Sequence, residues 1–85
     1  MKAAVKEYKA AIEKDSAEIL AHINLTQSLL DIESEKDIKN RSYGEVLTAY
    51  KELQKAEEAK GELSSLELSR MGVLREQLKG LGVIS

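Results

Sequence analysis

His22 is the only histidine of this 85-residue chain, and histidine is the side chain best suited to acid–base or metal chemistry near neutral pH. Glu18 stands four residues before it, a spacing that brings two side chains together on one face of a helix. Further ligands for a metal would all have to be carboxylates, so a metal-binding or small-molecule-binding bundle is a remote alternative. The pattern favours a partly exposed histidine on a helix.

The other reactive residue types do not form a catalytic pattern. The chain has no cysteine, and its serines stand mostly at helix-cap positions or in a polar linker. Acidic residues interleave with lysines, as they do on solvated helix faces. Gly80 and Gly82 follow a helical segment, whereas a phosphate-binding glycine loop precedes one. We therefore expect a protein without catalytic activity, metal or cofactor.

Six basic side chains are candidates for contacts with nucleic acid, and they lie in the polar linker and the last helical segment: Lys36, Lys39, Arg41, Arg70, Arg75 and Lys79. Acidic residues surround those in the linker, whereas Glu67 and Glu76 are the only acids on the last segment. Neither an aromatic stacking platform nor a basic recognition helix accompanies the six. Solvated helix faces are the favoured interpretation. A ring of several copies would still sum such charges into a DNA-binding surface.

Composition limits the class of protein further. A net charge of −2 provides no global attraction for nucleic acid or membranes, and the absence of cysteine fits a reducing compartment. No apolar run approaches the ~18 residues that span a bilayer, and the N-terminal residues lack the apolar core of a secretory signal. We expect a cytoplasmic protein without a membrane partner.

The last helical segment, about 64–81, has the clearest boundaries. Ser64 and Glu67 are spaced as a capping box, and Gly82 is placed to end the helix in the left-handed conformation. Its apolar residues recur at three and four positions and therefore share one face: Met71, Leu74, Leu78 and Leu81.

The preceding sequence predicts three more helices, about 2–14, 16–34 and 43–60. Asp15 or Ser16 is expected to begin the second of them, although the apolar pattern also permits one continuous helix over 2–34. The apolar residues of the second segment cover more than one face, which is typical of a central helix.

The linker between the second and third segments is polar. Asn40 is predicted to end the preceding helix, and Ser42 with Glu45 to form a second capping box. Gly61 is predicted to end the third helix. Short linkers place neighbouring helices antiparallel, and a chain without proline, Phe or Trp must build its core mainly from aliphatic residues. The expected fold is an all-α antiparallel bundle of three or four helices.

Residues 60–68, Lys-Gly-Glu-Leu-Ser-Ser-Leu-Glu-Leu, and 74–84, Leu-Arg-Glu-Gln-Leu-Lys-Gly-Leu-Gly-Val-Ile, resemble the end of some small terminase subunits of tailed bacteriophages. In that family a helix ends in a similar turn, a capped helix follows, and the chain closes on a glycine-isoleucine pair. The resemblance implies a ring-forming, non-catalytic helical protein that recognises viral DNA for packaging. No helix-turn-helix region is evident in the rest of this sequence.

We expect residues 1–85 to form a single helical domain that acts as a non-catalytic protein–protein interaction or assembly module. The partner is a second copy, which gives a homo-oligomer, or another protein. A DNA-packaging or DNA-binding regulatory subunit like the small terminases is the alternative. The predicted interaction face consists of aliphatic side chains on the second and fourth segments: Ile19, Ile23, Leu30, Met71, Leu74 and Leu78.

Overall fold

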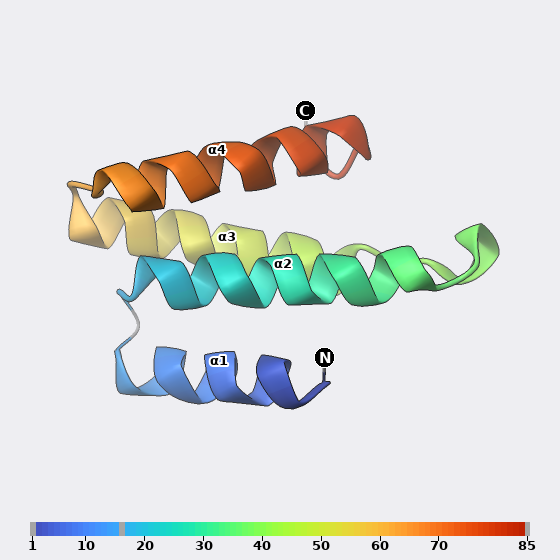
Figure 1. The fold of residues 1–85 in the computed structure, drawn as a ribbon, viewed down its shortest axis with the longest axis horizontal. Coiled ribbons are helices and arrows are strands. Elements are labelled where there is room, and N and C mark those ends of the chain that lie inside the picture. Colours follow the sequence, from blue (N-terminus) through green and yellow to red (C-terminus); the bar gives the residue numbers. More distant parts are fainter. Residues whose placement is uncertain (1, 16, 85) are drawn as a thin grey trace.

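The computed structural model describes residues 2–15 and 17–84, and its regular structure there is entirely helical. The elements in chain order are α1 (Lys2–Lys14), α2 (Ile19–Glu35), the 3₁₀ helix η1 (Ile38–Asn40), α3 (Gly44–Lys60) and α4 (Ser65–Gly80). Successive α-helices run in opposite directions (Figure 1). The predicted all-α antiparallel bundle is confirmed, in its four-helix form.

The predicted break between the first two helices is also confirmed. α1 ends at Lys14 and α2 begins at Ile19. The Asp15 carboxylate accepts a hydrogen bond from the backbone N–H of Ala17 at 3.1 Å, which closes a local turn instead of capping α2. Ser16, the other predicted cap, lies outside the described residues.

α2 is the central helix, as the breadth of its apolar residues predicts. α1, α3 and α4 all pack against it, and α1 is the outermost element on its side of the molecule (Figure 1). The hydroxyl of buried Thr26 donates to the backbone carbonyl of His22 at 2.8 Å, so this polar group needs no partner on another helix. The largest fully buried apolar side chains come from α2, α3 and α4: Ile19, Val46, Leu53, Met71, Leu74 and Leu78.

Two charged side chains organise the connection between α2 and α3. The Glu33 carboxylate accepts hydrogen bonds from the backbone N–H of Ser42 and from Nζ of Lys36, both at 2.7 Å. The Arg41 guanidinium donates to the backbone carbonyls of Ser34 at 2.8 Å and Lys36 at 3.0 Å. These bonds satisfy carbonyls at the end of α2, which would otherwise have no partner in the helix.

The caps predicted for this connection are wrong. Tyr43 is the N-cap of α3, and its side chain makes no capping hydrogen bond. The carboxylate of Glu33 takes the Ser42 N–H that Glu45 was expected to accept, so the box cannot form. Asn40 lies in η1, and no described non-glycine residue has the left-handed backbone that a helix-ending asparagine adopts.

The predicted N-terminal cap of α4 is confirmed. The Ser64 hydroxyl accepts the Glu67 N–H at 3.2 Å, and the Glu67 carboxylate accepts the Ser64 N–H at 2.8 Å. Lys60 also donates to both carboxylate oxygens of Glu67, at 2.6 and 2.8 Å. The hydrogen bond from Lys60, with that from the Ser64 backbone, lowers the pKa of Glu67. One carboxylate thus caps α4 and ties it to the end of α3.

Glycines with positive φ follow both α3 and α4. Both were predicted to end their helices, and the left-handed conformation was predicted for Gly82. Gly61 has φ of +80° after α3, and Gly82 has φ of +75° after α4. At the second position, the Gly82 N–H donates to the Lys79 carbonyl and the Val83 N–H donates to the Leu78 carbonyl, at 3.1 and 2.9 Å. This pair of bonds is the Schellman motif, which a residue with a Cβ forms only under strain.

Candidate protein-interaction surfaces

The six side chains predicted to form the interaction face are buried inside one chain. Each is at most 4% exposed: Ile19, Ile23, Leu30, Met71, Leu74 and Leu78. They pack within the core that α2 and α4 share with α3. A partner cannot reach them while the chain is folded. Helical spacing identifies the face that a helix buries, but it does not say whether the covering helix belongs to the same chain.

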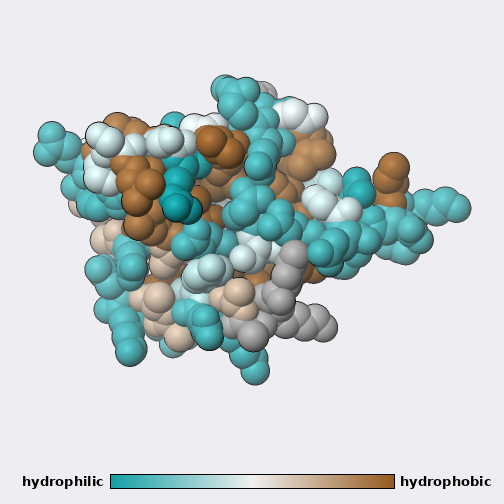
Figure 2. All heavy atoms as spheres, in the orientation of Figure 1, coloured by the Kyte–Doolittle hydropathy of each residue, from teal (hydrophilic) through white to brown (hydrophobic). Residues whose placement is uncertain are grey.

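Most of the exposed apolar side chains belong to α4 and its C-cap. Leu66, Val73 and Leu81 are 52, 57 and 45% exposed and follow one another at seven and eight residues. The seven-residue spacing places Leu66 and Val73 on one face of α4, and exposed Leu81 follows at its C-cap; we call these three residues the outer stripe of α4. Figure 2 shows apolar side chains among polar ones over this helix, along the upper edge of the view. Leu68 is 57% exposed as well, but it lies outside the stripe.

The position of Leu81 corrects its assignment to the buried face of α4. It is the C-cap residue, and the chain turns there before Val83 packs on the core. Sequence reasoning overlooked the outer stripe, although the seven-residue spacing of Leu66 and Val73 is a readable signal. The deeper stripe at Met71, Leu74 and Leu78 dominates the pattern of this helix.

Two opposite charges accompany the outer stripe. Arg70 stands three residues before Val73, and Glu76 stands three residues after it; both are exposed. Among the described residues, neither side chain takes part in an ion pair or a side-chain hydrogen bond. The outer face of α4 therefore offers both apolar surface and charges that the chain itself leaves uncompensated.

The basic residues considered for nucleic acid are divided between two regions and partly engaged. Arg75 donates to the Tyr50 hydroxyl at 3.0 Å and to the Glu57 carboxylate at 2.9 Å, and the bond to Tyr50 is the main reason that its pKa is raised. Lys36 and Arg41 are engaged in the connection between α2 and α3. The remaining three are exposed: Lys39, Arg70 and Lys79. A nucleic-acid partner remains a prediction.

His22 is buried, at 5% exposure, so its expected position on a partly exposed surface is wrong. α2 is covered on several sides, which leaves little of its surface open. Within residues 2–15 and 17–84, no group of three or more His, Asp or Glu side chains is arranged to hold a metal ion.

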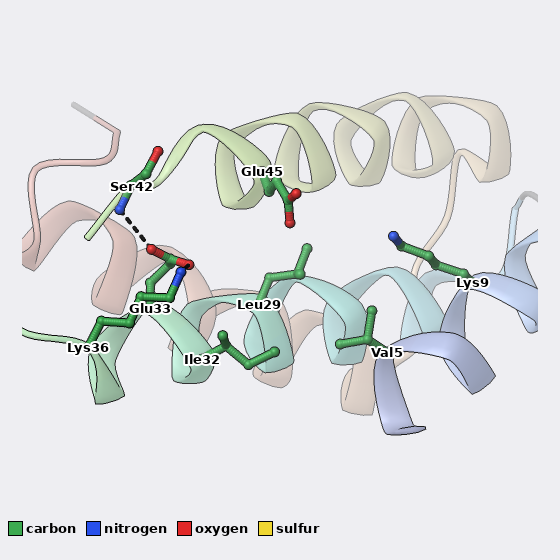
Figure 3. A pocket seen from close by; sticks show the side chains of 8 residues that line it. All are labelled: Val5, Lys9, Leu29, Ile32, Glu33, Lys36, Ser42 and Glu45. Carbon is green, nitrogen blue, oxygen red and sulfur yellow. Dashed lines mark hydrogen bonds and ion pairs between the residues drawn. The ribbon is translucent and has the colours of Figure 1, made fainter. Parts of the chain in front are cut away.

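A groove runs between α1 and α3 with α2 as its floor. Two adjoining hollows of about 360 and 550 Å³ share Lys9, Leu29 and Glu45 in their linings. Figure 3 shows the smaller hollow, with Leu29 of α2 and Glu45 of α3 facing one another and Lys9 reaching in from α1. We call this the α1–α3 groove, with Lys9 and Ile12 on one wall, Leu25 and Leu29 as floor, and Glu45 and Glu52 on the other wall.

Comparisons of this chain with protein-family models, with curated proteins and with solved structures find no match. The resemblance of residues 60–84 to small terminase subunits therefore stays a prediction. No helix in the part of the chain described by the structure is long and apolar enough to cross a membrane.

Proposed function

We propose that this chain is a non-catalytic helical assembly module that forms a two-fold dimer through the outer stripe of α4. The supporting observation is the stripe itself, in which Leu66 and Val73 on one face of α4 and Leu81 at its C-cap are each about half exposed. Single exposed leucines are ordinary in soluble proteins, whereas several on one helix face are typical of a contact surface. Dimerisation removes this area from water, which helps a small chain with a limited core.

The stripe is complementary to itself about a two-fold axis. In an antiparallel pair of α4 helices with the axis at Val73, that residue meets its own copy. Leu66 lies seven residues before Val73 and Leu81 lies eight residues after it. Leu66 therefore comes close to Leu81 of the second copy, and Leu81 comes close to Leu66 of the second copy. Two-fold interfaces require this match, because the same patch contributes both halves.

The charges favour the antiparallel pair over a parallel one. A parallel pair brings Arg70 beside its own copy and Glu76 beside its own copy, and like charges in contact oppose association. In the antiparallel pair of helices, Arg70 and its own copy lie six residues apart, about 9 Å along the helix, and so do Glu76 and its own copy. This arrangement also sets Arg70 level with Glu76 of the second copy. Exposed charges of this kind contribute about 0.2–1 kcal/mol each, so they select direction more than they supply affinity.

Molar mass measured by light scattering over a range of concentrations tests the proposal. We expect the wild-type chain to approach twice its 9.4 kDa mass as its concentration rises. Val73→Glu places two carboxylates at the axis and should give the mass of one chain. Leu68→Glu is the matched control, because this residue is also 57% exposed on α4 but lies off the stripe. It should associate as the wild type does.

Oxidative cross-linking locates the axis independently. The chain has no cysteine, so Val73→Cys introduces its only thiol. Because a disulfide requires Cα atoms within about 7 Å, mild oxidation should convert this variant into a covalent dimer. Leu68→Cys should remain mostly uncoupled. A wild-type chain with the mass of one copy at every soluble concentration would overturn the proposal, and so would equal coupling of the two cysteine variants.

A further inference from the structure

We infer that the α1–α3 groove binds an amphipathic helix of a partner protein, with Lys or Arg along the flank that faces α3. The groove lies between α1 and α3, whereas the proposed dimer uses the outer face of α4. The inference therefore stands on its own observations and does not depend on the dimer.

The groove is long enough to hold about two turns of a helix. α1 and α3 both pack on α2, and the two adjoining hollows between them run along α2 past Leu25 and Leu29. On the α3 side the lining extends from Glu45 to Glu52, which are two helical turns and about 10 Å apart. An amphipathic helix laid in such a groove completes a bundle and places apolar residues at every third and fourth position on the floor.

The floor is mainly apolar. Leu25 and Leu29 are 8 and 9% exposed and line the larger hollow together with His22, and Ile12 of α1 is only partly buried beside them. The apolar side chains of a bound helix would cover this surface. The two hollows measure about 360 and 550 Å³, which is space for several side chains rather than for a single water molecule.

The charges at the two walls differ and define the partner. Glu45 and Glu52 stand seven residues apart on the α3 wall, so both point along the same line of the helix, and Lys9 stands on the α1 wall. Glu52 contacts Lys55 at 3.4 Å, but both side chains are more than half exposed, and a pair of this kind is weak. The α3 wall therefore favours basic residues on the bound helix.

Two synthetic peptides of about 14 residues test the inference by fluorescence anisotropy at low salt. Both repeat leucine at three and four residues; one carries two lysines seven residues apart on a flank, and the other carries glutamates there. We expect the lysine peptide to bind about three- to tenfold more tightly than the glutamate peptide, as two exposed charge pairs allow. The Val73→Glu variant should bind the lysine peptide as the wild type does, which separates this result from the dimer.

Variants of exposed residues then locate the peptide. Glu52→Lys should remove most of the preference for the lysine peptide over the glutamate peptide. Glu58→Lys makes the same change of net charge on an exposed part of α3 outside the groove and should leave this preference unchanged. Thr48→Trp places a large ring in the larger hollow and should abolish binding of both peptides. Circular dichroism confirms that each variant remains helical.

Three results would overturn the inference. The first is equal affinity for the two peptides, and the second is an equal effect of Glu52→Lys and Glu58→Lys. The third is a fall in peptide anisotropy when an unlabelled Thr48→Trp/Val73→Glu chain is added: its own groove is blocked, so displacement would show that the groove of the wild-type chain accepts a second copy instead of a basic helix.

Discussion

Leu78→Ala tests whether α4 is held by the core of its own chain. Leu78 is fully buried, and its neighbours on the same face, Met71 and Leu74, are 1% exposed. Replacing leucine with alanine removes three carbon groups, and at about 0.8 kcal/mol each this costs about 2.4 kcal/mol of transfer free energy. The cavity that remains raises the expected loss of unfolding free energy to about 3–5 kcal/mol.

That loss is large for a chain of this size. With about 0.05–0.15 kcal/mol per residue, 85 residues give a total stability of about 4–13 kcal/mol. In urea unfolding followed by circular dichroism, a slope near 2 kcal/mol/M converts a loss of about 3 kcal/mol into a midpoint lower by about 1.5 M. Because Leu78 is buried in the core of a single chain, this shift of the midpoint should be the same at low and high protein concentration.

Leu66→Ala is the control, because it makes the same chemical change on the same helix at a residue that is 52% exposed. At low concentration it should cost less than about 1 kcal/mol. At high concentration the proposed dimer adds stability to the wild type, which the variant partly loses. A nearly neutral effect of Leu78→Ala, or an effect that grows with concentration as that of Leu66→Ala does, would show that α4 is not held by the core of its own chain.

Three further substitutions test the polar contacts that hold the helix ends. Ser64→Ala removes the α4 cap and should cost about 1 kcal/mol, seen as a thermal midpoint lower by about 4–8 °C; no change would refute the role of the cap. The lowered pKa of Glu67 means that its stabilising effect is complete above the unfolded pKa, about 4.3, and is lost as the pH falls through the folded value. The melting point of Glu67→Gln should therefore fall less than that of the wild type between about pH 6 and 3, and equal slopes would contradict this. Arg41→Ala should cost about 0.5–1.5 kcal/mol in urea unfolding, whereas Lys39→Ala, an exposed neighbour, should be nearly neutral; equal effects would argue against the carbonyl contacts of Arg41.

The ends of α4 were predictable because their signals are local. A capping box involves two residues three positions apart, and a Schellman motif involves one glycine and the turn before it. The sequence around Ser64 and Gly82 contains all the groups that make these bonds. The helical periods of the four segments are equally local, so the fold class and the approximate helix boundaries follow from the sequence.

The connection between α2 and α3 was not predictable in the same way. Its decisive hydrogen bond joins Glu33 to the N–H of Ser42, nine residues later in the chain. Ser42 and Glu45 have the spacing of a capping box, but spacing cannot show that a carboxylate from the preceding helix reaches the serine N–H first. Competition of this kind depends on how α2 and α3 pack, which a local motif does not contain.

The interaction surface shows the same limit on a larger scale, because α4 has two apolar stripes. Met71, Leu74 and Leu78 form one, and Leu66 with Val73 begins the other. Both have helical spacing, so periodicity alone does not show which of them contacts a partner. The antiparallel return of the chain covers the first stripe with α2 and α3 and leaves the second open. The surface left for a partner therefore consists of the apolar residues that the chain does not cover itself. The stripe of α4 that was predicted as the contact is buried by the chain's own helices.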